Sequence, residues 1–190
     1  DAEFFWQQDQ KNRLDDYVLR LEAVTFYKGL GDLKAKAGRL EKLSRALASY
    51  IDGCDVEHAG RAGYLAKADL VTGMVGEFPE LQGIIGGYYA RHDGEPASIS
   101  TAIATHYRPQ GPTDDVPQTP IAKAVALADK IDTLVGFFGI GTKPTGSKDP
   151  FGLRRAALGV IRIILDGKLR LPLQTLLNEA AKGYGFNAVD

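Results

Sequence analysis

The chain has 190 residues, of which 44% are hydrophobic and 25% are charged, and its formal net charge is −1. These values are typical of an ordinary soluble globular protein that can bury a core, and they exclude binding to nucleic acid through overall positive charge. The sequence has no apolar run near the roughly 18 residues of a membrane-spanning helix, and no signal-peptide pattern. The single cysteine, Cys54, cannot form an internal disulfide, which favours a cytoplasmic location.

The pattern of apolar residues predicts helices throughout the first half of the chain. Phe4, Phe5 and Trp6 are either anchored into a core or left from a neighbouring domain; we favour the second and assign residues 1–8 to the remnant of a preceding domain. Apolar residues at helical intervals predict helices over residues 9–27, 32–51, 57–75, 79–88 and 98–107. Three glycines inside the fourth helix indicate either close approach of another helix or a helix that is broken there.

The second half is predicted to contain two helices around a glycine-rich loop. Four prolines make residues 108–120 a surface loop, and helices follow over residues 121–138, from Asp149 at the N-cap with Pro150 at N1, and over residues 172–182. The predicted fold class is therefore all-α, with about eight helices and no strand pair. We assign residues 9–183 to one helical domain and residues 184–190 to a tail or linker.

Two long stretches carry a resemblance to a known family. Residues 126–163 are ALADKIDTLVGFFGIGTKPTGSKDPFGLRRAALGVIRI, and residues 65–96 are LAKADLVTGMVGEFPELQGIIGGYYARHDGEP. Both resemble the bacterial glycyl-tRNA synthetase β subunit, and the resemblance continues from Phe4 and fades after Asp166. It implies that this chain, which begins at Asp1 without an initiator Met, is an internal portion of a longer subunit.

The resemblance also implies a setting for the chain. The family works with an α subunit as an α2β2 heterotetramer, in which ATP, Mg²⁺ and glycine are used on the α subunit and the β subunit mainly supplies binding of tRNA-Gly. The expected role is a non-catalytic helical domain that contributes to tRNA binding and braces neighbouring domains. No catalytic residue, metal ligand, cofactor or membrane contact is expected in this segment.

The order of the helices resembles that of the HD-type metal hydrolases. That resemblance implies that Ala68-Asp69 occupies the position of the His-Asp pair and that Asp129 occupies the position of the last metal-binding Asp. The first His would lie on the helix over residues 32–51, which has none, and Arg39 is its nearest polar candidate. We therefore expect a buried salt-bridge network with Arg39 near Asp69 and Asp129, and an active HD-type phosphohydrolase stays as the alternative.

Two further motifs are weaker. His92-Asp93 falls in a predicted turn, and His58 and His106 have no helical partner, so surface or packing roles are expected for all three histidines. The glycines of residues 141–148 have the spacing of a phosphate-binding P-loop. However, Ser147-Lys148 stands where Lys-Ser/Thr is required, and the loop follows a helix rather than a strand.

Local positive charge is the remaining signal. Residues 141–170 hold seven Lys or Arg and two Asp, a net charge of +5. Lys143, Ser147, Lys148, Arg154 and Arg155, together with backbone amides at the start of the following helix, are candidates for contacts with tRNA phosphates. The alternative is a rigid corner in which Arg154 or Arg155 pairs with Asp129, Asp132 or Asp149, within a purely structural interaction module.

Overall fold

The computed structural model describes residues 1–187, and this part of the chain is all-helical, which confirms the predicted fold class. It holds ten α-helices rather than about eight, together with three short 3-10 helices. The α-helices are α1 (Ala2–Asp9), α2 (Leu14–Arg20), α3 (Leu33–Ala48), α4 (Val56–Leu65), α5 (Gly73–Glu77), α6 (Ile84–His92), α7 (Ala97–Thr105), α8 (Pro120–Gly139), α9 (Leu153–Asp166) and α10 (Leu173–Gly183). Among the described residues, no helix is long and apolar enough to cross a membrane.

The helix predicted over residues 9–27 is only partly right: α2 and a 3-10 helix (Leu21–Ala23) lie within this range, but the chain turns after Asp9 and becomes helical again only at Leu14. Asp9 ends α1 and is buried, and its carboxylate accepts hydrogen bonds from the backbone amides of Gly73 and Met74 and from the hydroxyl of Tyr89. A buried carboxylate must find such donors, and these come from distant parts of the chain. The helix predicted over residues 57–75 is likewise divided into α4, a 3-10 helix (Ala68–Val71) and α5.

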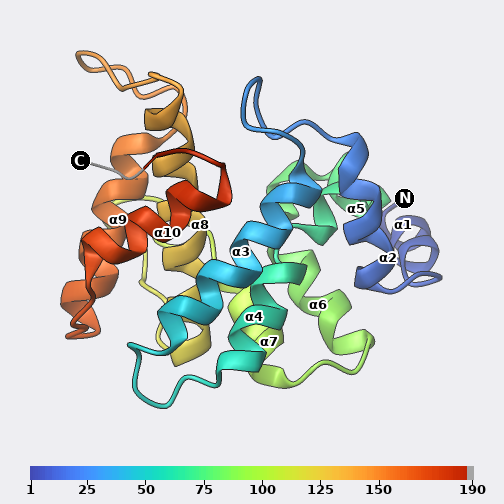
Figure 1. Cartoon of the computed structure of the whole chain (residues 1–190). Helices are drawn as coiled ribbons and strands as arrows, with labels where there is room; N and C mark the ends of the chain where they lie inside the picture. Colours follow the sequence, from blue (N-terminus) through green and yellow to red (C-terminus); the bar gives the residue numbers. More distant parts are fainter. Residues whose placement is uncertain (188–190) are drawn as a thin grey trace.

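The two long helices α3 and α8 form the centre of the bundle. The carboxylate of Asp32 caps α3 by accepting from the amide of Ala35 at 2.7 Å, and Thr119 caps α8 ahead of Pro120. α3 packs closely against α4, and α8 lies against α3, α7 and α9 (Figure 1). Most side chains of α8 are buried, so its sequence is apolar on nearly every side.

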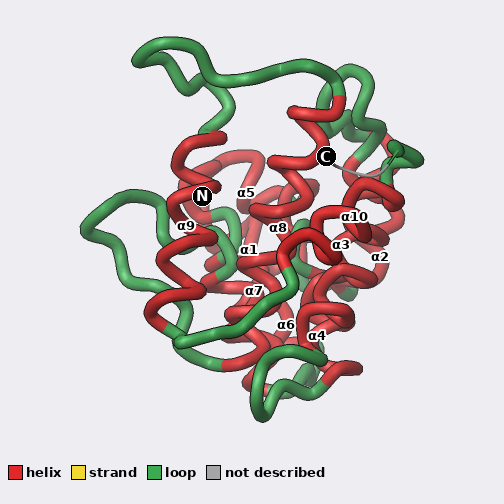
Figure 2. The backbone as a smooth tube through the Cα atoms, turned by 60° about the vertical axis from the view of Figure 1, so that its left-hand side comes forward, coloured by secondary structure: helices red, strands yellow, loops and turns green. Residues whose placement is uncertain are grey.

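Two main apolar clusters share these central helices. The first joins α1, α2, α4, α6 and α7 to the N-terminal turns of α3 and α8, and the second joins the later turns of both helices to α9 and α10. Figure 1 shows the resulting arrangement, with α9 and α10 at one end and the N-terminal helices at the other, and Figure 2 shows the loops around the bundle. A smaller cluster surrounds Leu30, Phe137 and Leu153.

Residues near both ends of the described part contact the helical core. Phe5 and Trp6 are partly buried against the first cluster, whereas Phe4 is exposed. Tyr184 and Phe186 pack against the second cluster. The domain divisions assigned at residues 8 and 183 stay predictions, and residues 188–190 of the expected tail lie outside the described part.

Candidate functional site

A buried ion-pair network joins α3, α8 and the end of α10. Nζ of Lys36 lies 2.8 Å from one carboxylate oxygen of Asp132, and Nε of Arg39 lies 2.8 Å from the other. The hydroxyl of Tyr184 donates to the same carboxylate at 2.8 Å, and its ring stacks on the guanidinium of Arg39. Burial opposes the ionisation of Asp132, but Lys36 and Arg39 outweigh it and lower its pKa below the usual range.

Asp129 lies one turn earlier on α8 and contacts two ammonium groups, one of which, that of Lys36, it shares with Asp132. Its Oδ2 lies 3.0 Å from Nζ of Lys67, and its Oδ1 lies 3.4 Å from Nζ of Lys36, an ion pair without hydrogen-bond geometry. Lys67 also lies 4.0 Å from the ring centre of Tyr107. Burial opposes ionisation here too, but Lys67 and Lys36 hold the pKa of Asp129 well below its usual range.

Asp69 is buried in a different setting. One carboxylate oxygen accepts from the backbone amides of Gly83 and Gly86 at 2.6 and 2.9 Å, and the other has no hydrogen-bond partner. Burial raises the pKa of Asp69 to about 6, against the lowering effect of the two amides. Gly86 allows this contact, because a Cβ there would lie 3.0 Å from the Asp69 carboxylate and 2.9 Å from Ile103, and both side chains would have to shift.

The network exists, but its partners differ from the predicted ones. Arg39 pairs with Asp132, and no ion pair in the described part of the chain joins it to Asp69 or Asp129. The prediction missed Lys36 and Lys67. The signal for Lys36 was its place on the apolar side of α3, one turn before Leu40, and that for Lys67 was its position beside Ala68-Asp69.

These residues do not fit the metal of an HD-type hydrolase. A divalent ion at Asp129 requires carboxylate or imidazole ligands, whereas Asp129 faces the ammonium groups of Lys36 and Lys67, which repel a cation. Across residues 1–187, no three His, Cys, Asp or Glu side chains are gathered closely enough to hold a metal ion. The positive charge that a metal would supply is carried here by two lysines.

The three histidines occupy separate environments. His106 is fully buried, and its Nδ1 lies 2.6 Å from the carbonyl oxygen of Ile103, so the neutral ring donates from this nitrogen. Burial lowers the pKa of His106 to about 3, and the nearby Lys67 acts in the same direction. His92 is exposed as the last residue of α6 rather than part of the turn, and His58 is half-buried in α4.

The basic corner, defined as Lys143, Ser147, Lys148, Arg154 and Arg155, lies in the loop before α9 and in its first turn. All five residues are exposed, and none of their side chains takes part in an ion pair among the described residues. Gly152 is the N-cap of α9, so the predicted helix start at Pro150 is wrong by three residues. Asp149 still caps the helix, because its carboxylate accepts from the amides of Leu153, Arg154 and Arg155.

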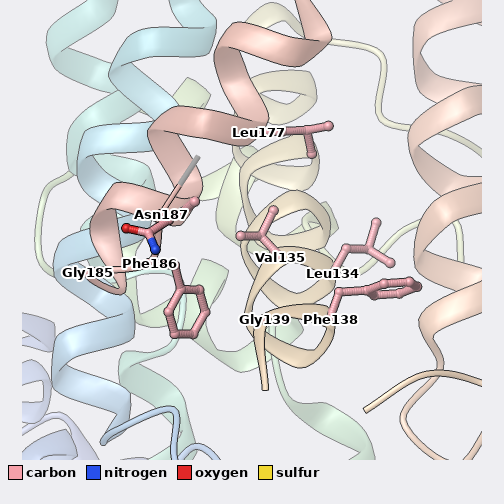
Figure 3. A pocket seen from close by; sticks show the side chains of 9 residues that line it. Leu134, Val135, Phe138, Gly139, Leu177, Gly185, Phe186 and Asn187 are labelled. Carbon is pink, nitrogen blue, oxygen red and sulfur yellow. The ribbon is translucent and has the colours of Figure 1, made fainter. Parts of the chain in front are cut away.

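Two hollows differ in chemical character. One of about 200 Å³ lies beside Asp129 and Lys130 and has Arg155 in its wall, so it borders both the network and the basic corner. The other, of about 730 Å³, lies between the end of α8 and α10 (Figure 3). Its wall holds no titratable side chain and consists of Leu134, Val135, Phe138, Gly139, Leu177, Ala181, Gly185, Phe186 and Asn187.

The fold and this site define a class, that of helical modules whose buried polar centre is held by ion pairs. The model of the family described as glycyl-tRNA synthetase beta subunit matches residues 1–189. The chain is 55% identical over 181 residues to the glycine–tRNA ligase beta subunit of Phenylobacterium zucineum and 54% identical over 185 residues to that of Erwinia tasmaniensis, which covers 94% and 97% of this chain. The chain belongs to the glycyl-tRNA synthetase beta subunit family.

The match covers only part of those relatives. In both alignments, the chain spans 27% of the relative's length, so most of each relative's polypeptide lies outside the compared region.

Proposed function

We propose that the chain is a non-catalytic helical module of the β subunit of a glycine–tRNA ligase, and that it helps to bind tRNA-Gly through the basic corner. In this proposal ATP, Mg²⁺ and glycine are bound on the α subunit of a cytoplasmic α2β2 enzyme. The family membership supports the setting, because the matched relatives are named glycine–tRNA ligase beta subunits.

One observation carries the proposed RNA contact. Lys143, Lys148, Arg154 and Arg155 are exposed and lack ion-pair partners among the described residues, whereas buried cations such as Lys36 are paired. Exposed unpaired cations are the groups that exchange counterions for phosphates. The proposal uses side chains only, because the amides at the start of α9 already donate to Asp149.

The test is the binding of tRNA-Gly by the whole synthetase carrying Arg154→Ala and Arg155→Ala. We expect weaker binding and a plot of log K against log salt that is less steep by roughly 2, about one for each lost phosphate contact. The matched control replaces Lys11 and Lys42, two exposed cations outside the basic corner, by alanine. If both double variants bind with the unchanged salt slope, the basic corner is not an RNA contact.

A structural module is the second candidate, and a specific observation favours it. The carboxylate of Asp149 occupies the start of α9, which would otherwise attract an anion. The basic corner therefore has its own anion at the helix terminus and needs no phosphate there. If the Arg154→Ala and Arg155→Ala variant binds tRNA-Gly normally, the structural module is the function that remains. An HD-type phosphohydrolase is not proposed, because Lys36 and Lys67 occupy the surroundings of Asp129.

A further inference from the structure

The outer side of α9 carries an apolar stripe that no described residue covers. Leu158, Ile161 and Leu165 are spaced by three and four residues, so they lie on one side of the helix. Their exposed fractions are 61%, 51% and 71%, and Leu165 and Leu158 are the most exposed large apolar residues in the described part of the chain. The opposite side of α9 is buried through Leu153, Gly159, Val160 and Ile163.

The outer side of α9 therefore mixes apolar and cationic side chains, because Arg154 and Arg162 share it with the stripe at helical spacing. A helix at the surface of a protein normally has polar residues opposite its buried side. α9 lies at the edge of the bundle (Figure 1), so its outer side is available to another protein element. Contiguous exposed apolar side chains of this kind mark interaction sites.

A cavity adjoins the stripe at Leu158. This cavity, of about 210 Å³, lies between α9 and the loop before α8, with Pro109, Pro112, Leu158 and Gly159 in its wall. The guanidinium of Arg162 donates to the backbone oxygens of Gly111 and Asp114, which holds this loop against α9. A large apolar side chain from a partner helix would fit beside Leu158.

The charge around the stripe indicates the chemistry of the partner. Residues 158–170, which exclude the basic corner, hold three cationic side chains and one carboxylate, a net charge of +2, and Lys168 stands one turn beyond the C-terminal end of the stripe. A second copy of α9 would bring the same excess of positive charge against this one, which disfavours self-association. RNA is disfavoured by the stripe itself, because bases stack on aromatic rings and the stripe is aliphatic.

We propose that this stripe docks an amphipathic helix with flanking Asp and Glu residues, which belongs to the part of the β-subunit polypeptide outside this chain. Most of the length of the matched relatives lies outside the compared region. A helix in the same polypeptide would meet α9 at a high effective concentration, because the two are covalently linked. This inference rests on the family membership and not on tRNA binding, so either proposal can fail without the other.

The test is hydroxyl-radical footprinting, read by mass spectrometry at single side chains, on the full-length β subunit without α subunit or tRNA. The 190-residue chain serves as the reference. We expect oxidation of Leu158, Ile161 and Leu165 to fall severalfold in the full-length subunit, because the rate follows exposed area. Equal oxidation in both proteins overturns the proposal. Protection that appears only after α subunit or tRNA is added also overturns it, because that result assigns the stripe to another partner.

A variant pair separates docking from folding. Leu158→Glu combined with Leu165→Glu in the full-length subunit should restore oxidation of Ile161, whereas Leu173→Glu, at an exposed leucine off the stripe, should not. In the 190-residue chain both variants should melt at the temperature of the unmodified chain, because the replaced side chains are exposed. Protection of Ile161 that survives the double change contradicts the docking contact.

Discussion

At the scale of single residues, the buried charges of this chain are balanced one against another. Asp132 forms ion pairs with Lys36 and Arg39 and accepts a hydrogen bond from the hydroxyl of Tyr184. Asp129 forms ion pairs with Lys67 and Lys36. Such pairs contribute little net stability, because desolvation offsets the attraction, but removing one partner leaves an uncompensated buried charge. We therefore expect the network to specify how α3 meets α8 more than it strengthens the fold.

Asp132→Asn tests this balance. The change leaves two buried cations with one negative charge fewer, and we expect the free energy of unfolding to fall by about 3–5 kcal/mol. Urea denaturation followed by circular dichroism measures it. The matched control is Glu57→Gln, which breaks the exposed ion pair between Arg45 and Glu57 and should leave the urea midpoint unchanged. Similar midpoints for both variants would mean that the network does not hold the charges of Lys36 and Arg39.

Asp69 gives the chain a pH dependence of the opposite sign to that of a paired carboxylate. Its pKa is raised from 3.8 to about 6, so the folded state binds the proton more tightly and stability is lost as pH rises between these values. Asp69→Asn removes this loss. We expect the stability of the variant relative to the unmodified chain to rise by about 1–3 kcal/mol between pH 4 and pH 7. Asp129 and Asp132 titrate alike in both proteins, so their contributions cancel in the difference in stability. If the stabilities of the two proteins change with pH in parallel, the raised pKa of Asp69 is contradicted.

At the scale of helices, α3 and α4 share the most extensive contact in the described part of the chain, and a glycine permits it. A Cβ on Gly63 would lie 2.6 Å from the carbonyl oxygen of Leu40 and 2.6 Å from the hydroxyl of Ser44. Backbone cannot yield as a flexible side chain can, so Gly63→Ala should destabilise the chain by about 1–3 kcal/mol.

The matched control for that change is Gly38→Ala on α3, where a Cβ meets no atom within 4 Å beyond its chain neighbours and the nearby backbone of its own helix. It should stabilise the chain by about 0.5–1 kcal/mol, because alanine favours the helix more than glycine does. Differential scanning calorimetry of the two variants measures both effects. A stabilised Gly63→Ala variant would show that α3 and α4 can separate without cost.

Helices were predictable from sequence where local signals determine them. Apolar residues at helical spacing predicted α3 and α8, and the caps Asp32 and Thr119 place the starts of both helices within one residue of the predicted starts. The turn after Asp9 was not predictable from local sequence. The Asp9 carboxylate is held there by three hydrogen bonds from residues more than 60 positions away. The two aspartates of α8 were found, but their partners depend on how α3 and α4 approach, which spacing along one helix cannot give.

At the scale of the whole molecule, the two apolar clusters meet along α3 and α8. Leu33 and Ala37 of α3 lie in the first cluster and Leu40 in the second, while Val125 and Leu127 of α8 divide in the same way. Lys36, Arg39, Asp129 and Asp132 of the ion-pair network lie on these two helices, close to the boundary between the two clusters. Neither cluster can therefore lose its packing without disturbing a helix that the other one needs.

We accordingly expect the chain to unfold in urea as one cooperative unit. Trp6, the only tryptophan, contacts the first cluster, so its fluorescence reports on the N-terminal end, whereas far-ultraviolet circular dichroism reports on all helices. The variant Trp6→Phe with Phe186→Trp moves the fluorescent probe to the second cluster. Within each protein, fluorescence and circular dichroism should give the same midpoint. A fluorescence midpoint displaced from that of circular dichroism in either protein would show that the clusters unfold separately, and that α3 and α8 do not couple them.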